Sequence, residues 1–149
     1  MRAVVQRVAS ARVEIEGELV GSCGTGYLVL LGVAEGDGEA DAQKLWRKLR
    51  DLRIMPDEAG KTNLSLIDVA GELLVVSQFT LMADCRRGRR PSFIDAAEPD
   101  LARRLYEYFV ELARADVAQV QTGVFGADMR VSLVNDGPFT VVIDSRDLA

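Results

Sequence analysis

The sequence predicts one α/β domain, in which mixed or antiparallel β-sheets are covered by two main helices. Three observations lead to this prediction. β-rich runs separated by turn residues fill most of the chain, and two segments carry apolar residues at helical spacing. The chain has 149 residues without a linker, repeat or low-complexity segment, which fits one domain over residues 1–149. Its 48% of hydrophobic residues suffices for a real core.

The strands are expected from β-rich runs bounded by turn residues. The stretches 11–15 and 19–23 flank Glu16-Gly17-Glu18, which is typical of a hairpin. The stretch 27–33 is continuously apolar and therefore suits a strand buried on both faces, and 73–79 is expected to be the next central strand. Further strands are expected at 2–8, 117–125, 129–134 and 140–143.

The two helices are expected at 37–52 and at about 99–115. In the first, Leu45, Leu49 and Leu52 recur at helical spacing. The second begins at Pro99, because proline is favoured in the first turn of a helix. Its apolar stripe consists of Leu101, Leu105, Tyr106, Phe109, Val110, Leu112 and Ala113.

The absence of histidine restricts the chemistry that this chain can perform. It excludes serine–histidine and cysteine–histidine nucleophiles, histidine-ligated zinc and a histidine general base. Cys23 and Cys85 form no CxxC motif, so we expect two free thiols, no metal site and no cofactor. No run approaches the ~20 apolar residues of a membrane span, and the first residues lack the apolar stretch of a signal peptide. A cytoplasmic protein without a membrane partner is expected.

The net charge of −5 argues against broad, non-specific binding of nucleic acid. The positive charges are nevertheless clustered. Arg86, Arg87, Arg89 and Arg90 lie within five residues, and Arg47, Lys48, Arg50 and Arg53 form a second group in and just after the first helix. A protein that binds only the end of an RNA can be acidic overall and still have a basic surface at its binding site. The alternative is that both groups are solvated surface charges.

Polar residues end the apolar strand of residues 73–79. Strand alternation places Ser77 and Phe79 on one face, and Gln78 and Thr80 on the other. Without a nearby base neither hydroxyl is an activated nucleophile, and both residues could instead cap backbone groups at the strand end. Strand ends and the loops after them are common places for binding and catalysis.

Gly137-Pro138 alone predicts an ordinary turn between two strands, in which Asp136 shapes the turn. Four aspartates lie near these motifs in the sequence: Asp84, Asp95, Asp128 and Asp136. Nothing in their spacing selects two of them as an acid/base pair.

Taken together, Ser77-Gln-Phe-Thr-Leu81 and Asn135-Asp-Gly-Pro138 resemble the two signature motifs of the D-aminoacyl-tRNA deacylases of the D-tyrosyl-tRNA deacylase type. The resemblance extends from Ala3-Val-Val-Gln-Arg-Val8 through Gly88-Arg-Arg-Pro-Ser-Phe93 to the Gly-Pro dipeptide. It implies an enzyme that hydrolyses the ester between a D-amino acid, or glycine, and the terminal adenosine of tRNA, and that rejects L-amino acids.

The resemblance also assigns roles to residues. Ser77, Gln78, Phe79 and Thr80 would line the pocket for the aminoacyl-adenosine 3′ end of tRNA. Backbone N–H groups there would form an oxyanion hole. Gly137 and Pro138 would form a Gly-cis-Pro element inserted into the pocket of a partner subunit in a homodimer. Water would be the nucleophile, assisted by main-chain dipoles and by the 2′-hydroxyl of the adenosine.

Four further positions match the family less directly. Phe125 and Met129 would hold the terminal adenine, although core packing is an alternative for both. Arg7 would brace the Gly-Pro loop, unless it is a solvated charge at a strand end. Ala102 would lie near the amino acid. Phe139 stands where the family usually has valine, which puts the local packing in doubt rather than the function.

A second class of function uses the same residues without catalysis. Phe125, Met129 and the arginine cluster 86–90 would also suit a non-catalytic module that binds an RNA end or a nucleotide.

Overall fold

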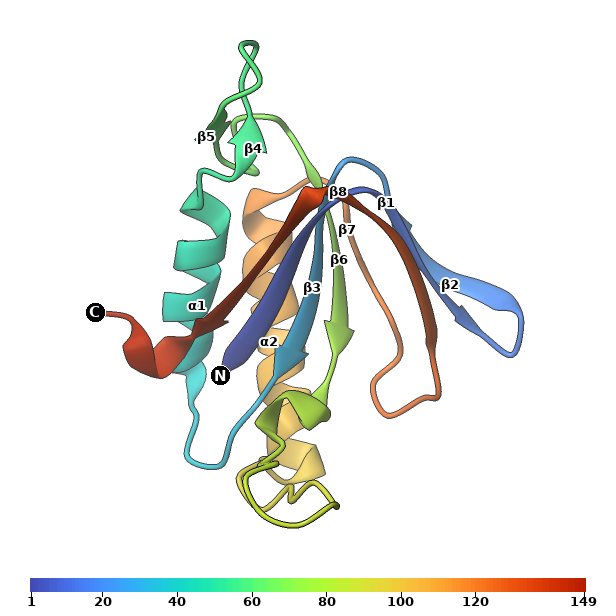
Figure 1. The fold of residues 1–149 in the computed structure, drawn as a ribbon, viewed down its shortest axis with the longest axis vertical. Coiled ribbons are helices and arrows are strands. Elements are labelled where there is room, and N and C mark those ends of the chain that lie inside the picture. Colours follow the sequence, from blue (N-terminus) through green and yellow to red (C-terminus); the bar gives the residue numbers. More distant parts are fainter.

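In the computed structural model, which describes residues 1–149, one long strand organises the sheet (Figure 1). This strand, β1 (Arg2–Ile15), is antiparallel to three others. Its first half pairs with β3 (Gly26–Gly32), its second half with β2 (Glu18–Cys23), and nearly all of it with β8 (Arg130–Asp144).

Two expected strand breaks are therefore wrong. Residues 2–8 and 11–15 belong to the single strand β1, and all of 129–134 except Met129, together with 140–143, belongs to the single strand β8. Irregularities in the β1–β8 register between Gln6 and Ser10 let the pair bend without ending. The residues around Gly137 bulge from β8 at this bend instead of connecting two strands.

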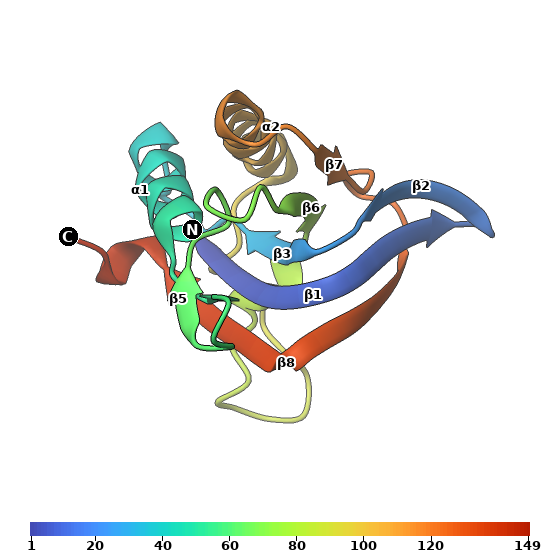
Figure 2. The same cartoon turned by 90° about the horizontal axis from the view of Figure 1, so that it is seen from above.

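The other half of the sheet is parallel. β3 pairs with β6 (Glu72–Ser77), and β6 pairs with β7 (Val120–Thr122). β7 is thus much shorter than the expected 117–125. The sheet curls until β2 approaches β7 (Figure 2), and the amide of Ser22 donates a 2.8 Å hydrogen bond to the side chain of Gln121. Gly21 makes this approach possible, since a Cβ there would lie 2.3 Å from the carbonyl oxygen of Thr122.

Helices α1 (Glu39–Asp51) and α2 (Pro99–Asp116) lie on the same side of this curved sheet (Figures 1 and 2). Both predicted helices and the predicted mixed-sheet fold class are confirmed. Two short strands that were not expected, β4 (Met55–Pro56) and β5 (Thr62–Leu64), pair antiparallel after α1. Two single turns of 3-10 helix, η1 (Phe79–Met82) and η2 (Ser145–Asp147), complete the structure. None of the helices combines the length and the apolar character that crossing a membrane requires.

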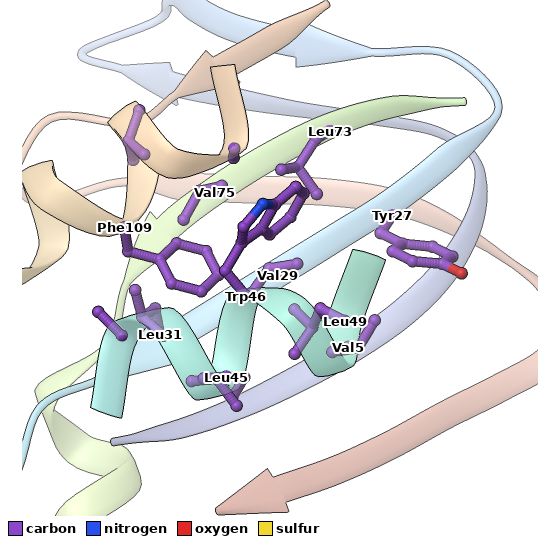
Figure 3. Close-up of a cluster of buried hydrophobic side chains, with 14 of the residues drawn as sticks. Val5, Tyr27, Val29, Leu31, Leu45, Trp46, Leu49, Leu73, Val75 and Phe109 are labelled. Carbon is purple, nitrogen blue, oxygen red and sulfur yellow. The ribbon is translucent and has the colours of Figure 1, made fainter. Parts of the chain in front are cut away.

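The main core lies between the helices and the sheet (Figure 3). Trp46 of α1 meets Phe109 of α2 edge to face, with ring centroids 5.7 Å apart. A smaller cluster, which includes Leu28, Leu74 and Val76, fills the opposite face of the central strands. Burial on both faces explains why the runs 27–33 and 73–76 are continuously apolar.

Candidate active site

A pocket of about 530 Å³ opens where β3 and β6 end. One wall is the stretch 76–79, a second is the first half of α2, and the third is the loop 125–131. Most of the lining side chains are apolar, and Asp128 is the only carboxylate among them. The volume is in the usual range for small-molecule sites. A single carboxylate provides no acid/base pair, as the spacing of the acids in the sequence suggested.

The structure corrects the geometry expected for Ser77 to Thr80. β6 ends at Ser77, and the chain turns into η1 at Phe79, so strand alternation does not extend over these residues. The amide of Gln78 still donates a 2.8 Å hydrogen bond to the carbonyl of Leu31. The turn then passes over Gly32, where a Cβ would lie 3.0 Å from the Gln78 carbonyl oxygen.

The four residues of this motif do not share one environment. Ser77, Gln78 and Phe79 line the pocket, whereas Thr80 does not and is exposed to solvent. The side-chain amide of Gln78 donates a hydrogen bond to the hydroxyl of Thr80, and no charged group bonds to that hydroxyl. Thr80 therefore has no base that would activate it as a nucleophile.

Phe125, Met129 and Ala102 all line the pocket. Phe125 and Met129 are half-buried, so each keeps surface available to a ligand. Gly123 lies where a Cβ would be 2.5 Å from the sulfur of Met129, and the missing side chain leaves room for the thioether. The pocket thus brings together six of the site residues predicted from the sequence. Their roles toward substrate stay predictions.

Tyr106 was not predicted as a site residue, because its position in the apolar stripe of α2 indicated only core packing. It lines the pocket, and its hydroxyl donates a 2.9 Å hydrogen bond to the carbonyl of Val75. Burial raises the pKa of Tyr106 to about 12. A polar hydroxyl within the apolar stripe was the only sign of this role in the sequence.

Gly137 and Pro138 do not line the pocket of their own chain. Both are exposed, and the peptide bond between them is cis. Gly137 has a φ of 135°, which disfavours side chains there. Asn135 closes the base of the loop: its side chain accepts a 2.9 Å hydrogen bond from the amide of Phe139 and donates one of 3.0 Å to the Phe139 carbonyl.

Arg7 contacts this exposed loop directly. Its Nε donates a 2.9 Å hydrogen bond to the carbonyl of Asp136, and its Nη1 donates one of 2.8 Å to the carbonyl of Ile54. The guanidinium also lies 4.9 Å from the centre of the Phe139 ring. Arg7 is therefore not a free surface charge, and its contacts match those of a brace for the Gly-Pro loop.

The two basic clusters lie on different elements. Arg86 to Arg90 occupy an exposed loop closed by the bridge between Asp84 and Ser92, and Arg86 forms an ion pair with Asp84 at 2.7 Å. The second cluster is on α1 and just after it, where Arg50 pairs with Asp51 and Asp116. No three carboxylate or thiol side chains gather in an arrangement that could hold a metal ion.

The family model and the relatives found by sequence agree on one family. The family model described as "D-Tyr-tRNA(Tyr) deacylase" matches residues 4–144. The chain is 56% identical over 146 residues to a D-aminoacyl-tRNA deacylase of Thermosipho africanus, with 98% of each chain covered. It is 58% identical to the protein of that name from Dehalococcoides mccartyi, which covers 99% of this chain and 96% of the relative.

Solved structures show the same architecture. A structure titled "c-Myc DNA Unwinding Element Binding Protein" superposes with a TM-score of 0.92 at 38% identity, over 97% of this chain and 98% of the other. A structure of a probable eukaryotic D-amino acid tRNA deacylase shares the fold, with a TM-score of 0.82 at 17% identity over 96% and 98% of the two chains. From the extent of the family match and the identity to these relatives, the chain belongs to the D-Tyr-tRNA(Tyr) deacylase family.

Proposed function

We propose that this protein is a D-aminoacyl-tRNA deacylase that hydrolyses the ester between a D-amino acid and the terminal adenosine of tRNA. Family membership supports the activity, and one observation supports its location. The pocket brings the Ser77–Phe79 turn next to Phe125 and Met129. An acyl group at the turn and an adenine at the other two residues would together occupy one cavity.

The chemistry relies on the main chain rather than on a side-chain nucleophile. The first N–H groups of η1, those of Phe79 and Thr80, have no carbonyl acceptor within the turn itself. Directed at the ester carbonyl, they would stabilise the oxyanion, an effect worth about 3–4 kcal/mol per donor in acyl transfer. Water attacks the ester, and the 2′-hydroxyl of the adenosine assists.

Selection of D-amino acids and glycine is assigned to Gly137 and Pro138 of a partner subunit. Their exposure on their own chain supports this assignment, because the loop is free to enter a second molecule. The loop presents backbone there and no recognition side chain, so it excludes the L-side chain by shape. A homodimer is therefore the active form, and closed dimers are the commonest oligomers of soluble proteins.

Release of amino acid from D-tyrosyl-, L-tyrosyl- and glycyl-tRNA tests the activity and its selectivity. We expect rapid hydrolysis of the D-tyrosyl and glycyl esters, with the L-tyrosyl ester nearly untouched. Equal rates on the two tyrosyl enantiomers would contradict chiral selection. Tight binding of the tRNA end without hydrolysis of any ester would identify a non-catalytic RNA-end module instead.

Mixing two inactive variants tests whether the site is shared between subunits. A Gly137→Val subunit has an intact pocket and a damaged loop, whereas an Ala102→Trp subunit has a filled pocket and an intact loop. Mixed dimers regain one complete site if the loop acts in the partner's pocket. Both variants must first form dimers by light scattering. No recovery in confirmed mixed dimers would show that each loop serves its own chain.

A further inference from the structure

Phe125 contacts two side chains of α2, those of Tyr106 and Arg103. The ring of Tyr106 lies 5.9 Å from it at an interplanar angle of 50°. The guanidinium of Arg103 lies 4.7 Å from the centre of the same ring. Phe125 and Tyr106 both line the pocket, and Arg103, which does not line it, places its charge beside Phe125.

The positive charge of Arg103 is not neutralised by the protein. Asp100 and Glu107 lie one helical turn away on either side, and Asp128 lines the pocket, but none of the three forms an ion pair with Arg103. The next residue behaves differently: Arg104 pairs with Glu39 of α1 at 3.2 Å. Arg103 is exposed and donates no hydrogen bond within the chain, so all five of its N–H donors are available to a ligand.

We propose that Arg103 binds the phosphate on the 5′ side of the terminal adenosine of the substrate. This inference rests on the proposed function, in which that adenine contacts Phe125 and Met129. The 5′-phosphate of a nucleotide is one ribose away from its base. A base lying against Phe125 therefore brings its phosphate within reach of a long side chain that covers the same ring.

Arginine suits this role for two physical reasons. Its planar guanidinium can donate two parallel hydrogen bonds to one phosphate, which makes the contact both stronger and more directional than a point charge. Its contact with the Phe125 ring orders the side chain before the ligand arrives, so less conformational freedom is lost on binding. Arg103 thereby distinguishes a terminal nucleotide within a polynucleotide from a free nucleoside.

Binding of two small probes tests the phosphate contact without reference to catalysis. Adenosine and adenosine 5′-monophosphate are titrated into the wild type, Arg103→Gln and the control Arg104→Gln. We expect the phosphate to strengthen binding about tenfold in the wild type and in Arg104→Gln, and less than about twofold in Arg103→Gln. Adenosine itself should bind equally to all three proteins. Arg103→Lys should keep part of the preference for the monophosphate over adenosine, because lysine retains the positive charge but cannot donate two parallel hydrogen bonds.

Hydrolysis of two substrates supplies the second readout. With D-tyrosyl-tRNA, Arg103→Gln should raise KM about tenfold and leave kcat unchanged. With 3′-D-tyrosyladenosine, which has no 5′-phosphate, the same variant should behave as the wild type. An equal loss on both substrates would overturn the proposal, because Arg103 would then act only by supporting Phe125. A wild type that binds adenosine and its monophosphate equally would overturn it as well.

The two proposals fail in different ways. If the wild type hydrolyses no D-tyrosyl-tRNA but still prefers the monophosphate through Arg103, the deacylase assignment fails and the phosphate site stands. If hydrolysis is normal and the preference is absent, only the role of Arg103 is lost.

Discussion

Arg7 and Phe139 lie on the paired strands β1 and β8, and the guanidinium of Arg7 is 4.9 Å from the centre of the Phe139 ring. Through its hydrogen bond to the Asp136 carbonyl, the same guanidinium also joins β1 to the backbone just before Gly137. The ring at position 139 therefore contacts the same guanidinium that holds the Gly-Pro loop.

Replacing Arg7 with alanine should weaken both stability and activity. Two carbonyls lose their donor, so we expect the free energy of unfolding to fall by about 2–3 kcal/mol. Displacement of the Gly-Pro loop should slow hydrolysis of D-tyrosyl-tRNA more than tenfold. Urea unfolding and single-turnover hydrolysis measure the two effects. Arg12→Ala is the control on the same strand, because Arg12 is exposed and its ion pair with Glu14 is long, at 3.9 Å. Full activity of Arg7→Ala would contradict the bracing role.

Phe139→Val should separate stability from catalysis. The ring is half-buried, packs against the main core and contacts Arg7, so its truncation should lower the free energy of unfolding by about 1–2 kcal/mol. The deacylation rate should stay within about threefold of the wild type, because Gly137, Pro138 and the Arg7 hydrogen bonds remain. A large loss of rate in a stable variant would give Phe139 a direct role in the site.

Thr80→Ala should keep substantial deacylation activity. Thr80 is exposed, lies outside the pocket lining and has only the Gln78 amide as a side-chain partner. Its loss removes one hydrogen bond, which predicts at most about a tenfold lower rate. Single-turnover hydrolysis of D-tyrosyl-tRNA measures the rate of the variant, and acid-quench mass spectrometry of the wild type tests for a covalent intermediate. A loss beyond about 1,000-fold together with a trapped aminoacyl-enzyme would show that Thr80 attacks the ester.

The loop arginines should contribute unequally to tRNA binding. Arg86 pairs with Asp84 and holds the pKa of that carboxyl down to about 2, whereas Arg87, Arg89 and Arg90 form no ion pair. Alanine at these three positions should flatten the plot of log tRNA affinity against log salt concentration by roughly 0.7 for each phosphate contact that is lost. Arg86→Ala should change the slope least. An unchanged slope in the triple variant would leave the loop as ordinary solvated surface.

Alkaline unfolding should report on Cys23. Burial, with a smaller contribution from the charge of Glu72, raises the pKa of the Cys23 thiol from 9.0 to about 11. The folded protein thus keeps the thiol proton that the unfolded chain loses, so this stabilisation is complete below pH 9 and disappears as the pH rises to 11. Between these pH values, the Cys23 thiol should lower the free energy of unfolding by at most about 1.4 kcal/mol per pH unit. Cys23→Ala should flatten the stability curve between pH 9 and 11, whereas Cys85→Ala, at an exposed thiol, should follow the wild type. If the wild type and both variants show the same dependence of stability on pH, the Cys23 thiol is not the cause of the loss of stability above pH 9.

The sequence predicted the central strands and both helices because hydrophobic periodicity is a local property. It failed at the end of β6, because the turn after Ser77 depends on Gly32, a residue of another strand that leaves room for it. The contacts of Arg7 with Asp136 and Ile54 could not be read from periodicity either, since both partners are distant in the sequence. The motifs Ser77–Leu81 and Asn135–Pro138 indicated the site only through family resemblance. Nothing in the sequence singled out Arg103, because its contact with Phe125 depends on how α2 packs in the fold.

The pairing of β1 with β8 has a consequence for how the protein is made. β1 (Arg2–Ile15) leaves the ribosome long before β8 (Arg130–Asp144) and the loop that precedes it. Until then Arg7 has no Asp136 carbonyl to bind, and the pocket has no Phe125–Met129 wall. A growing chain therefore carries no finished site, and one edge of β1 stays open to other strands until β8 has been synthesised. Completion of the pocket thus coincides with the closing of that exposed edge.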